Sequence, residues 1–198
     1  MPKLINKSEK KIITEIMKNP GLNLREIISR TKLSPNVVTE YVNYFVKKEV
    51  IIEDRLIKNK RTYLRRFSVN YKSNLAKNLI SLIKESEKEE FFLKYKSLEQ
   101  AFNQIVENVK KIDFILVYGS YARFAADKES DIDILIVGDI TNKDEIRETL
   151  VSLEIEPSIK IERLSDFKKR IGDDLHKQII KEHILLFDSG NFIKSIQK

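Results

Sequence analysis

Residues 119–120, Gly-Ser, and residues 130–137, Ser-Asp-Ile-Asp-Ile-Leu-Ile-Val, decide the fold of the second half of this chain. One apolar strand is predicted over Ile112–Tyr118, directly before the Gly-Ser pair, and another over Ser130–Val137. Because side chains alternate along a strand, Asp131 and Asp133 share one face. Carboxylates held close together repel each other, so a cation usually neutralises them. Mg²⁺ is the natural candidate, because it prefers carboxylate oxygens.

The Gly-Ser pair predicts a place for phosphate beside the two carboxylates. Gly119 permits close approach of the backbone, and Ser120 stands before a helix expected over Tyr121–Ala126. The hydroxyl and the free N–H groups at a helix start can hold phosphate oxygens, so a nucleoside triphosphate would fit. Arg123 leaves alternatives open: it faces a phosphate, braces an aspartate or forms a structural ion pair.

These residues carry a family resemblance. Gly119-Ser120, ten residues and then Asp131-Ile132-Asp133 resembles the signature of the polymerase β nucleotidyltransferase superfamily, with the spacing of its minimal members, over roughly residues 98–187. The resemblance implies transfer of a nucleoside monophosphate from an NTP, with ATP as the first candidate for that NTP. It also implies that three carboxylates hold Mg²⁺ or Mn²⁺. Phe124 departs from the glycine that these proteins usually have after the arginine, which affects the loop around the triphosphate.

The third carboxylate is the open point of the predicted site. The family takes it from a neighbouring strand, which is expected here over Leu153–Glu162 and contains no Asp. Glu156 is the first candidate and Glu162 the second, while Pro157 suits an edge strand because it cannot donate to a ladder. If neither glutamate is a ligand, the site binds a nucleotide without turning it over.

The remainder of the second half is predicted to be helical. One amphipathic helix is expected over Leu164–Phe187, and the tail from Asn191 is expected to be frayed. His176 and His183 lie two turns apart on such a helix, too far along its axis to share one ion, which argues against a histidine metal site.

Charge divides the chain into two parts. The net charge is +7, and residues 1–70 hold 16 Lys and Arg against 7 Asp and Glu, whereas residues 71–198 hold 21 against 23. The whole positive excess therefore lies in the first third of the chain. A basic region of this kind favours a polyanionic partner, although a generally lysine-rich surface is the simpler alternative.

The basic part has the pattern of a winged helix. Helical periodicity over residues 7–18, 24–30 and 36–48 is followed by strands over residues 50–52 and 63–69. The stretch resembles archaeal and bacterial winged-helix regulators over about residues 7–70, which implies a third helix in the major groove and a basic wing along the backbone. Protein docking is the alternative use of this fold. The base-contact candidates are Asn36, Thr39 and Asn43, and the phosphate candidates are Lys47, Lys58, Lys60, Arg61, Arg65 and Arg66.

The fold class expected is α+β, with a winged helix-turn-helix at 1–70, a helical connector at 71–97 and a nucleotidyltransferase-type mixed sheet flanked by helices at 98–198. The connector lacks Gly and Pro and is expected to break near Ser86–Glu90. Its stripe of Leu75, Leu79, Leu82 and Ile83 indicates either a homodimer contact or packing within its own domain.

Composition excludes several functions. The chain has no Cys, so it has no disulfide, thiolate metal site or cysteine nucleophile. No apolar run is long enough to span a membrane and no signal peptide is recognisable, so we expect a cytoplasmic protein.

Two hypotheses for the function remain. The first is a nucleotidyltransferase, whose acceptor the resemblance to minimal members suggests is a HEPN-type toxin protein modified with AMP. The second is a DNA-binding transcription regulator, bound to duplex DNA through residues 1–70, in which the nucleotidyltransferase fold senses nucleotide or dimerises.

Overall fold

The computed structural model describes residues 5–59, 62–127, 129–140, 143–151 and 156–196. The chain forms two compact units, Met1–Ile83 and Lys84–Lys198. The domain limits expected from the sequence, 1–70, 71–97 and 98–198, stay predictions. No helix among the described residues is both long enough and apolar enough to cross a membrane.

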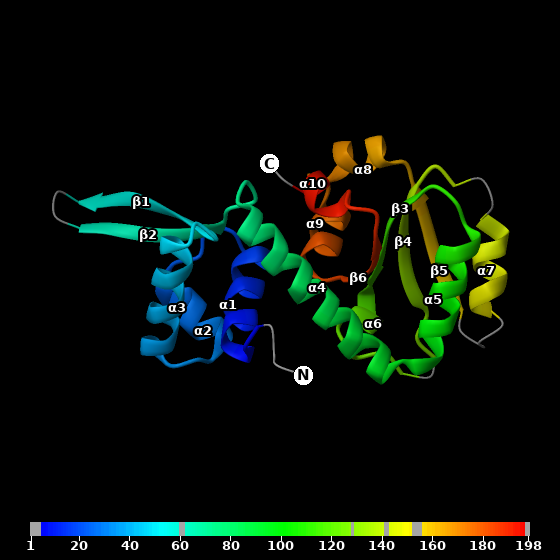
Figure 1. Cartoon of the computed structure of the whole chain (residues 1–198), viewed down its shortest axis with the longest axis horizontal. Coiled ribbons are helices and arrows are strands. Elements are labelled where there is room, and N and C mark those ends of the chain that lie inside the picture. The colour runs from blue at the N-terminus through cyan, green and yellow to red at the C-terminus, as the bar shows by residue number, and fades with distance from the viewer. Residues whose placement is uncertain (1–4, 60–61, 128, 141–142, 152–155, 197–198) are drawn as a thin grey trace. The chain divides into compact units, whose positions relative to one another are not determined.

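The first unit has the helix, helix, helix, hairpin order expected from its sequence (Figure 1). Its elements are α1 (Lys7–Lys18), α2 (Leu24–Thr31), α3 (Pro35–Lys47), β1 (Ile51–Asn59) and β2 (Thr62–Val69). Asn6 and Asn23 each form a capping box with the glutamate three residues later, and Ser34 caps α3 in front of Pro35. These caps satisfy amide groups that a helix leaves free at its start, so each helix begins where the sequence places a capping side chain.

Two helices follow, α4 (Asn74–Lys94) and α5 (Lys96–Asn108). The expected break near Ser86–Glu90 is wrong, because α4 runs through this segment and the chain turns at Tyr95. Ion pairs one turn apart, Lys84 with Glu87 and Glu85 with Lys88, explain why the charged segment stays helical. The predicted leucine stripe is split: Ile83 is buried, whereas Leu75 and Leu82 are exposed.

The second unit contains a mixed sheet in the order β5-β4-β3-β6. Its strands are β3 (Ile112–Tyr118), β4 (Ile132–Gly138), β5 (Pro157–Glu162) and β6 (Ile184–Asp188). β3 pairs antiparallel with β4 and β6, while β4 and β5 are parallel. The short helix α6 (Gly119–Ala122) follows β3, and α7 (Lys143–Val151) joins β4 to β5. The predicted α+β fold with a mixed sheet is therefore confirmed.

Helices cover both faces of this sheet (Figure 1). On one face Ile134 and Ile136 pack in a cluster with residues of α5 and α7. On the other face Leu135 and Val137 pack with residues of α8 (Leu164–Arg170), α9 (Asp174–Lys181) and α10 (Phe192–Ile196). Because both faces of β4 are covered, a polar side chain on this strand can contact solvent only near an end of the strand.

The single helix expected over Leu164–Phe187 is wrong. The segment forms α8 and α9 with Gly172 between them, and it ends as strand β6. Gly172 disfavours a continuous helix, and the apolar run Ile184–Phe187 supplies a fourth strand that covers the edge of β3. The tail is not frayed throughout, since Phe192 of α10 is fully buried.

Candidate functional site

The two aspartates lie at the start of β4. Asp133 is a register partner of Tyr118 on β3 and of Ser158 on β5, and it is half-buried, whereas Asp131 is exposed. Burial raises the pKa of Asp133 above its ordinary value, and the negative charge of Asp131 raises it further. The Ser158 hydroxyl, which donates a hydrogen bond to the carboxylate, and the charge of Arg123 oppose this increase in the pKa. A bound cation would offset the electrostatic repulsion between the carboxylates of Asp131 and Asp133.

Gly119 lies directly against the Asp133 side chain. Its φ of +70° is left-handed, and a Cβ atom on this residue would collide with the carboxylate of Asp133. Any other residue would therefore be strained and would displace the carboxylate. The Gly-Ser pair and the aspartates, eleven residues apart in the chain at their nearest, form one site.

The segment after Gly119 differs from the expected helix over Tyr121–Ala126. Helix α6 is a single turn that ends at Ala122, and the chain then turns at Phe124, whose φ is +57°. Ser120 lies within this turn, where its carbonyl accepts a hydrogen bond from the N–H of Ala125. Phe124 stands where the family usually has glycine, and it adopts a left-handed backbone conformation that glycine adopts more easily than other residues.

Aromatic packing and one hydrogen bond hold Phe124 in this conformation. Its ring stacks on Tyr95 with ring centres 6.3 Å apart and meets Phe91 edge-on at 6.4 Å. The ammonium group of Lys94 donates to the Phe124 carbonyl. The end of α4 and the residue after it therefore fix the loop that begins at Gly119.

A pocket of 180 Å³ opens beside Asp133. Arg123 lies at this pocket, with Nη1 3.8 Å from Oε2 of Glu182, and both side chains are about half exposed. Helix α9 supplies Leu175 and Gln178, and Glu182 caps its C-terminal end; sequence reasoning missed all three as site residues. Their helical spacing is visible in the sequence, but only the tertiary structure brings that face of α9 to β4. The pocket is lined by Tyr118, Gly119, Arg123, Asp133, Leu175, Gln178, Ile179 and Glu182.

The two glutamates considered as third carboxylate lie at different ends of β5. The carbonyl of Glu156 accepts a hydrogen bond from the N–H of Ile132, so Glu156 is beside the start of β4. Its exposed carboxylate lies 2.7 Å from Nη2 of Arg147. Glu162 is the register partner of Val137, four residues beyond Asp133. Among the described residues no group of three His, Cys, Asp or Glu side chains is placed to hold a metal ion.

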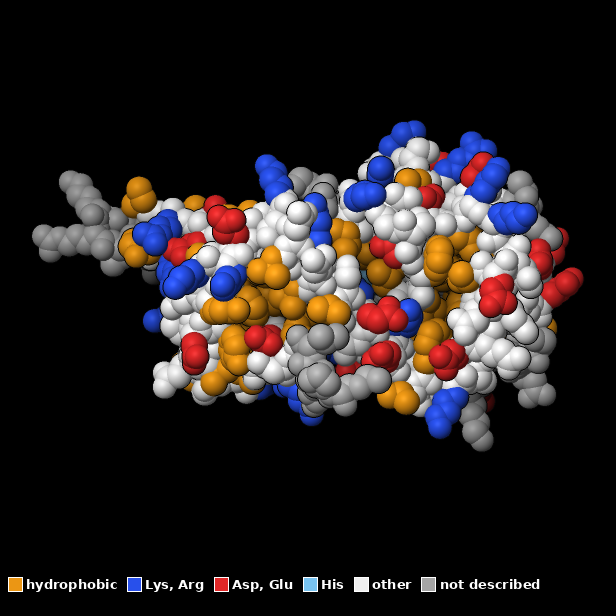
Figure 2. Space-filling view, in the orientation of Figure 1, with side chains coloured by type: hydrophobic (Ala, Val, Ile, Leu, Met, Phe, Trp, Pro, Cys, Tyr) orange, Lys and Arg blue, Asp and Glu red, His pale blue; other side chains and the backbone are white. Residues whose placement is uncertain are grey.

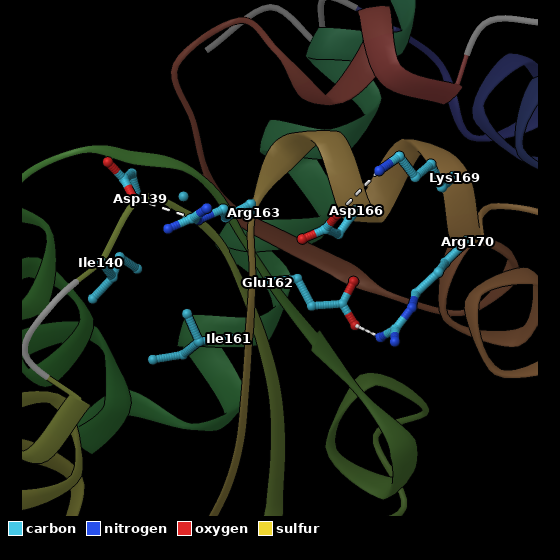
Figure 3. A pocket seen from close by; sticks show the side chains of 9 residues that line it. Asp139, Ile140, Ile161, Glu162, Arg163, Asp166, Lys169 and Arg170 are labelled. Carbon is cyan, nitrogen blue, oxygen red and sulfur yellow. Dashed lines mark hydrogen bonds and ion pairs between the residues drawn. The ribbon is translucent and has the colours of Figure 1, made fainter.

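The carboxylate of Glu162 is surrounded by basic side chains, of which Figure 3 shows Arg170. Its carboxylate is buried and lies 3.0 Å from Nε2 of His176, 2.9 Å from Nζ of Lys160 and 3.3 Å from Nη1 of Arg170. Burial alone would raise the pKa of Glu162, but the hydrogen bonds from His176 and Lys160 and their charges lower it overall. The second histidine, His183, places Nδ1 3.0 Å from the carbonyl oxygen of Ile179.

The candidate nucleic-acid contacts of α3 point mostly to solvent. Asn36, Asn43 and Lys47 are exposed, and Thr39 is half-buried. Oδ1 of Asn43 accepts a hydrogen bond of 2.9 Å from Arg65 of the hairpin.

The predicted phosphate contacts of the hairpin are only partly free. Arg65 also pairs with Glu53 at 2.8 Å, and Arg66 donates to the carbonyl of Gly21 at 2.7 Å. The side chain of Lys58, and the residues Lys60 and Arg61, lie outside the described part of the chain.

Comparisons with known families match both units. The family described as polymerase beta, nucleotidyltransferase matches residues 100–191, and the family described as winged helix-turn-helix DNA-binding matches residues 5–52. Two solved structures share 18% sequence identity with the chain. One is a toxin–antitoxin with AMP-PNP, at a TM-score of 0.35 over 48% of this chain and 77% of that chain. The other is a "putative nucleotidyltransferase from Sulfolobus solfataricus", at a TM-score of 0.30 over 54% and 87%.

A curated relative matches over its nearly complete length. It is the "Putative protein adenylyltransferase MJ0604" of Methanocaldococcus jannaschii, which is 32% identical over 98 residues, 45% of this chain and 97% of the relative. Together with the match over residues 100–191 and the Gly-Ser and Asp-x-Asp residues gathered at one site, this similarity shows that the chain belongs to the polymerase beta nucleotidyltransferase family.

Proposed function

We propose that this protein transfers AMP from ATP to a hydroxyl group of a partner protein in a Mg²⁺-dependent reaction, and that it binds duplex DNA through residues 1–70. One observation carries the proposed transferase activity. Asp131 and Asp133 share a face at the start of β4, and the backbone of Gly119 lies against the carboxylate of Asp133. Membership of the nucleotidyltransferase family supports the same reaction class.

The residues at this site fit a divalent cation. Mg²⁺ is commonly held by one or two carboxylates together with substrate phosphates, and Asp131 and Asp133 supply such a pair. Mn²⁺, with similar oxygen ligands, is the alternative ion. When bound, the ion would neutralise the phosphates and orient them. We propose Glu156 as the third carboxylate, because it stands at the same end of the sheet and its exposed side chain is free to turn from Arg147.

The reaction needs one bond formed and one broken. The oxygen of the acceptor hydroxyl attacks the α-phosphorus of ATP, the α–β phosphoanhydride bond breaks, pyrophosphate leaves with the bonding electrons, and the hydroxyl proton passes to a base. We assign to Asp133, the more buried aspartate, the role of holding the cation that would neutralise the α-phosphate. We assign the negative charge of the triphosphate to the N–H groups after Gly119, to Ser120 and to the guanidinium of Arg123.

A protein is the proposed acceptor because of the relative named as a protein adenylyltransferase. A HEPN-type toxin protein is our specific candidate. The test incubates the full chain with α-labelled ATP, Mg²⁺ and the product of the neighbouring gene. Label on the partner and released pyrophosphate support the transferase. Nucleotide binding without pyrophosphate release from any NTP, with Mg²⁺ or Mn²⁺, would replace it by a DNA-binding regulator that senses nucleotide.

The proposed DNA binding rests on the winged helix-turn-helix match and on the positive excess of residues 1–70. Binding of the full chain to labelled duplex DNA should weaken steeply as salt increases, because bound cations displace counterions from the phosphates. No binding at low salt would remove this part of the proposal. The homodimer stays a prediction, supported by the exposed Leu75 and Leu82 of α4, and sedimentation equilibrium tests it.

A further inference from the structure

The second unit has another pocket, at the ends of β4 and β5 that lie away from the aspartates (Figure 3). Its volume is 510 Å³, and it opens where β4 ends at Gly138 and β5 ends at Glu162, whereas Asp133 lies near the start of β4. In open sheets, ligands commonly bind in the crevice outside the carboxyl ends of parallel strands. A volume of this size is within the range of small-molecule sites.

The lining of this pocket combines apolar and basic side chains. Ile140 and Ile161 form the apolar part, and both are half-buried. The basic part comes from Arg163, which stands directly before α8, and from Lys169 and Arg170 at the last turn of that helix. Arg163 and Lys169 are six residues apart, which is about 9 Å along a helix axis. A ligand that contacts both of these cations therefore has to be longer than a single phosphate group.

Loose ion pairs hold the cations at the two ends of the pocket (Figure 3). Nε of Arg163 lies 3.7 Å from Oδ1 of Asp139, and Nζ of Lys169 lies 3.6 Å from Oδ1 of Asp166. Both distances exceed that of a hydrogen bond, and all four side chains are half exposed or more. Exposed pairs of this kind contribute little to stability, so an anionic ligand can replace the aspartates at little cost to the fold.

Arg170 is held more firmly than the other two cations. Its Nη1 lies 3.3 Å from the buried carboxylate of Glu162, which Lys160 and His176 also contact. Hydrogen bonds from His176 and Lys160 help to lower the pKa of Glu162, so this carboxylate is ionised. Because Lys160 and Arg170 offset its charge, Glu162 fixes Arg170 at the pocket without repelling an anion.

The charge around the pocket favours an anionic ligand. Five basic side chains pair there with three carboxylates, and Figure 2 shows Lys and Arg side chains gathered over α8 and beside it. Residues 71–198 hold 21 Lys and Arg against 23 Asp and Glu, so this positive excess is local. The basic side chains are Lys111, Lys160, Arg163, Lys169 and Arg170, and the acids are Asp139, Glu162 and Asp166.

We propose that this pocket is a second nucleotide site, which binds a soluble nucleoside di- or triphosphate and takes no part in the transfer reaction. The phosphates lie along α8 between Arg163 and Lys169, where they form charge-assisted hydrogen bonds. The base covers Ile140 and Ile161 and removes their exposed apolar surface from water. Inorganic pyrophosphate lacks the base, and a nucleoside monophosphate lacks the second phosphate, so both should bind more weakly.

Methyl NMR of the full chain distinguishes the two pockets. The isoleucine methyl groups are labelled with ¹³C, and the signals of Ile140 and Ile161 report on this pocket, while that of Ile179 reports on the pocket beside Asp133. Titration with ADP in the absence of divalent cations should shift the Ile140 and Ile161 signals along a saturating curve. AMP should need about tenfold higher concentration for the same shift, because one charged hydrogen-bonding group is missing.

Neighbouring lysines of α8 provide the matched control. Lys168 and Lys169 are both exposed, but of the two only Lys169 lines the pocket. Lys169→Gln and Arg163→Gln should each weaken ADP binding about tenfold, since each removes one charged contact. Lys168→Gln should stay within about twofold of the parent. Because all three side chains are exposed, none of the variants should change the thermal unfolding temperature.

The possible results separate this site from the proposed transferase. ADP that shifts only the Ile179 signal, or equal losses in Lys168→Gln and Lys169→Gln, would overturn the second site while the catalytic pocket stands. Saturating shifts of Ile140 and Ile161 that are lost in Lys169→Gln support the second site, even if Ile179 never responds to ATP with Mg²⁺ and the transferase fails. A short single-stranded oligonucleotide that shifts Ile140 and Ile161 at lower concentration than ADP would assign the pocket to nucleic acid and overturn the proposal.

Discussion

Asp133 and Ser158 are register partners on the parallel strands β4 and β5, and the serine hydroxyl donates a hydrogen bond to the aspartate. The bond favours the ionised carboxylate and partly offsets the burial that raises the pKa of Asp133. Ser158 is thus the residue of β5 that acts on the central carboxylate of the site, although nothing in its local sequence distinguishes it.

The first prediction concerns pH. Ser158→Ala removes a bond to the charged form, so the pKa of Asp133 should rise, and the acid limb of the transfer rate should move to higher pH. Carboxyl ¹³C NMR titration of the metal-free protein measures the pKa without reference to activity. An unchanged or lower pKa in Ser158→Ala would show that the hydroxyl does not stabilise the carboxylate.

The second prediction separates activity from stability. Asp131→Asn and Asp133→Asn should each lower nucleotidyl transfer by about 100-fold or more, since even the outer partners of metal ligands contribute about 10- to 100-fold. The pKa of Asp133 is raised in the folded state, so the folded state favours the protonated carboxyl. This stabilisation of the fold is fully present below the pKa of Asp133 in the unfolded chain, and it is lost as the pH rises through the pKa in the folded state. Without metal at neutral pH, Asp133→Asn should therefore melt above the parent, whereas Asp131→Asn, at an exposed position, should not.

The third prediction distinguishes the two glutamates. Glu156→Gln should raise the Mg²⁺ concentration needed for half-maximal transfer, because the proposed third ligand loses its charge. Glu162→Gln should leave that concentration unchanged and lower the unfolding temperature instead, since it breaks a buried pair with His176. The opposite pattern would move the third ligand to Glu162, and a parent-like Mg²⁺ dependence in both variants would leave the two aspartates as the protein ligands.

The stability contribution of Glu162 should also depend on pH. Its folded-state pKa is lowered, so its stabilising effect is present above the unfolded pKa and is lost as pH falls through the folded value. Thermal unfolding of the parent and of Glu162→Gln across acidic pH should converge as this carboxylate is protonated.

The fourth prediction tests the left-handed backbone at Phe124. Phe124→Ala and Phe124→Gly both remove the ring from Tyr95, but only glycine also removes the strain of a positive φ. Left-handed backbone costs about 1–2 kcal/mol at a residue with a Cβ atom. Phe124→Gly should therefore be more stable to urea than Phe124→Ala by about 1 kcal/mol, the reverse of the order expected in ordinary helix or strand. Equal stabilities would mean that the loop relaxes when the ring is lost.

The fifth prediction concerns the surface of α3. Lys47→Ala should weaken binding to all duplex sequences alike and reduce the salt slope by about 1, because it removes one phosphate contact. Asn36→Ala should reduce discrimination between sequences and leave the slope unchanged. Competition binding with specific and random duplexes over a salt series measures both quantities, and a sequence-specific effect of Lys47→Ala would contradict its assignment.

Local patterns were sufficient for part of this structure. Helical periodicity predicted the three helices of the first unit, and strand alternation placed Asp131 and Asp133 on one face. The same reasoning failed over Leu164–Phe187, where an apolar run that continues a helical pattern also satisfies a strand. It became β6 because the edge of β3 was open to pairing, and this is a property of the assembled sheet.

The sequence by itself indicated the family, through the resemblance carried by Gly-Ser and Asp-x-Asp at their spacing, and with it the mixed α+β fold. Strand alternation placed the two aspartates on one face, because side chains two residues apart in a strand point the same way. Only the tertiary structure decided which side chains join them. The parallel pairing of β4 with β5 brings Ser158 to Asp133 and leaves Glu162 four residues away, and the packing of α9 on the sheet brings Gln178 to the pocket. Strand register and helix packing depend on contacts between residues far apart in the chain, and no local pattern contains them.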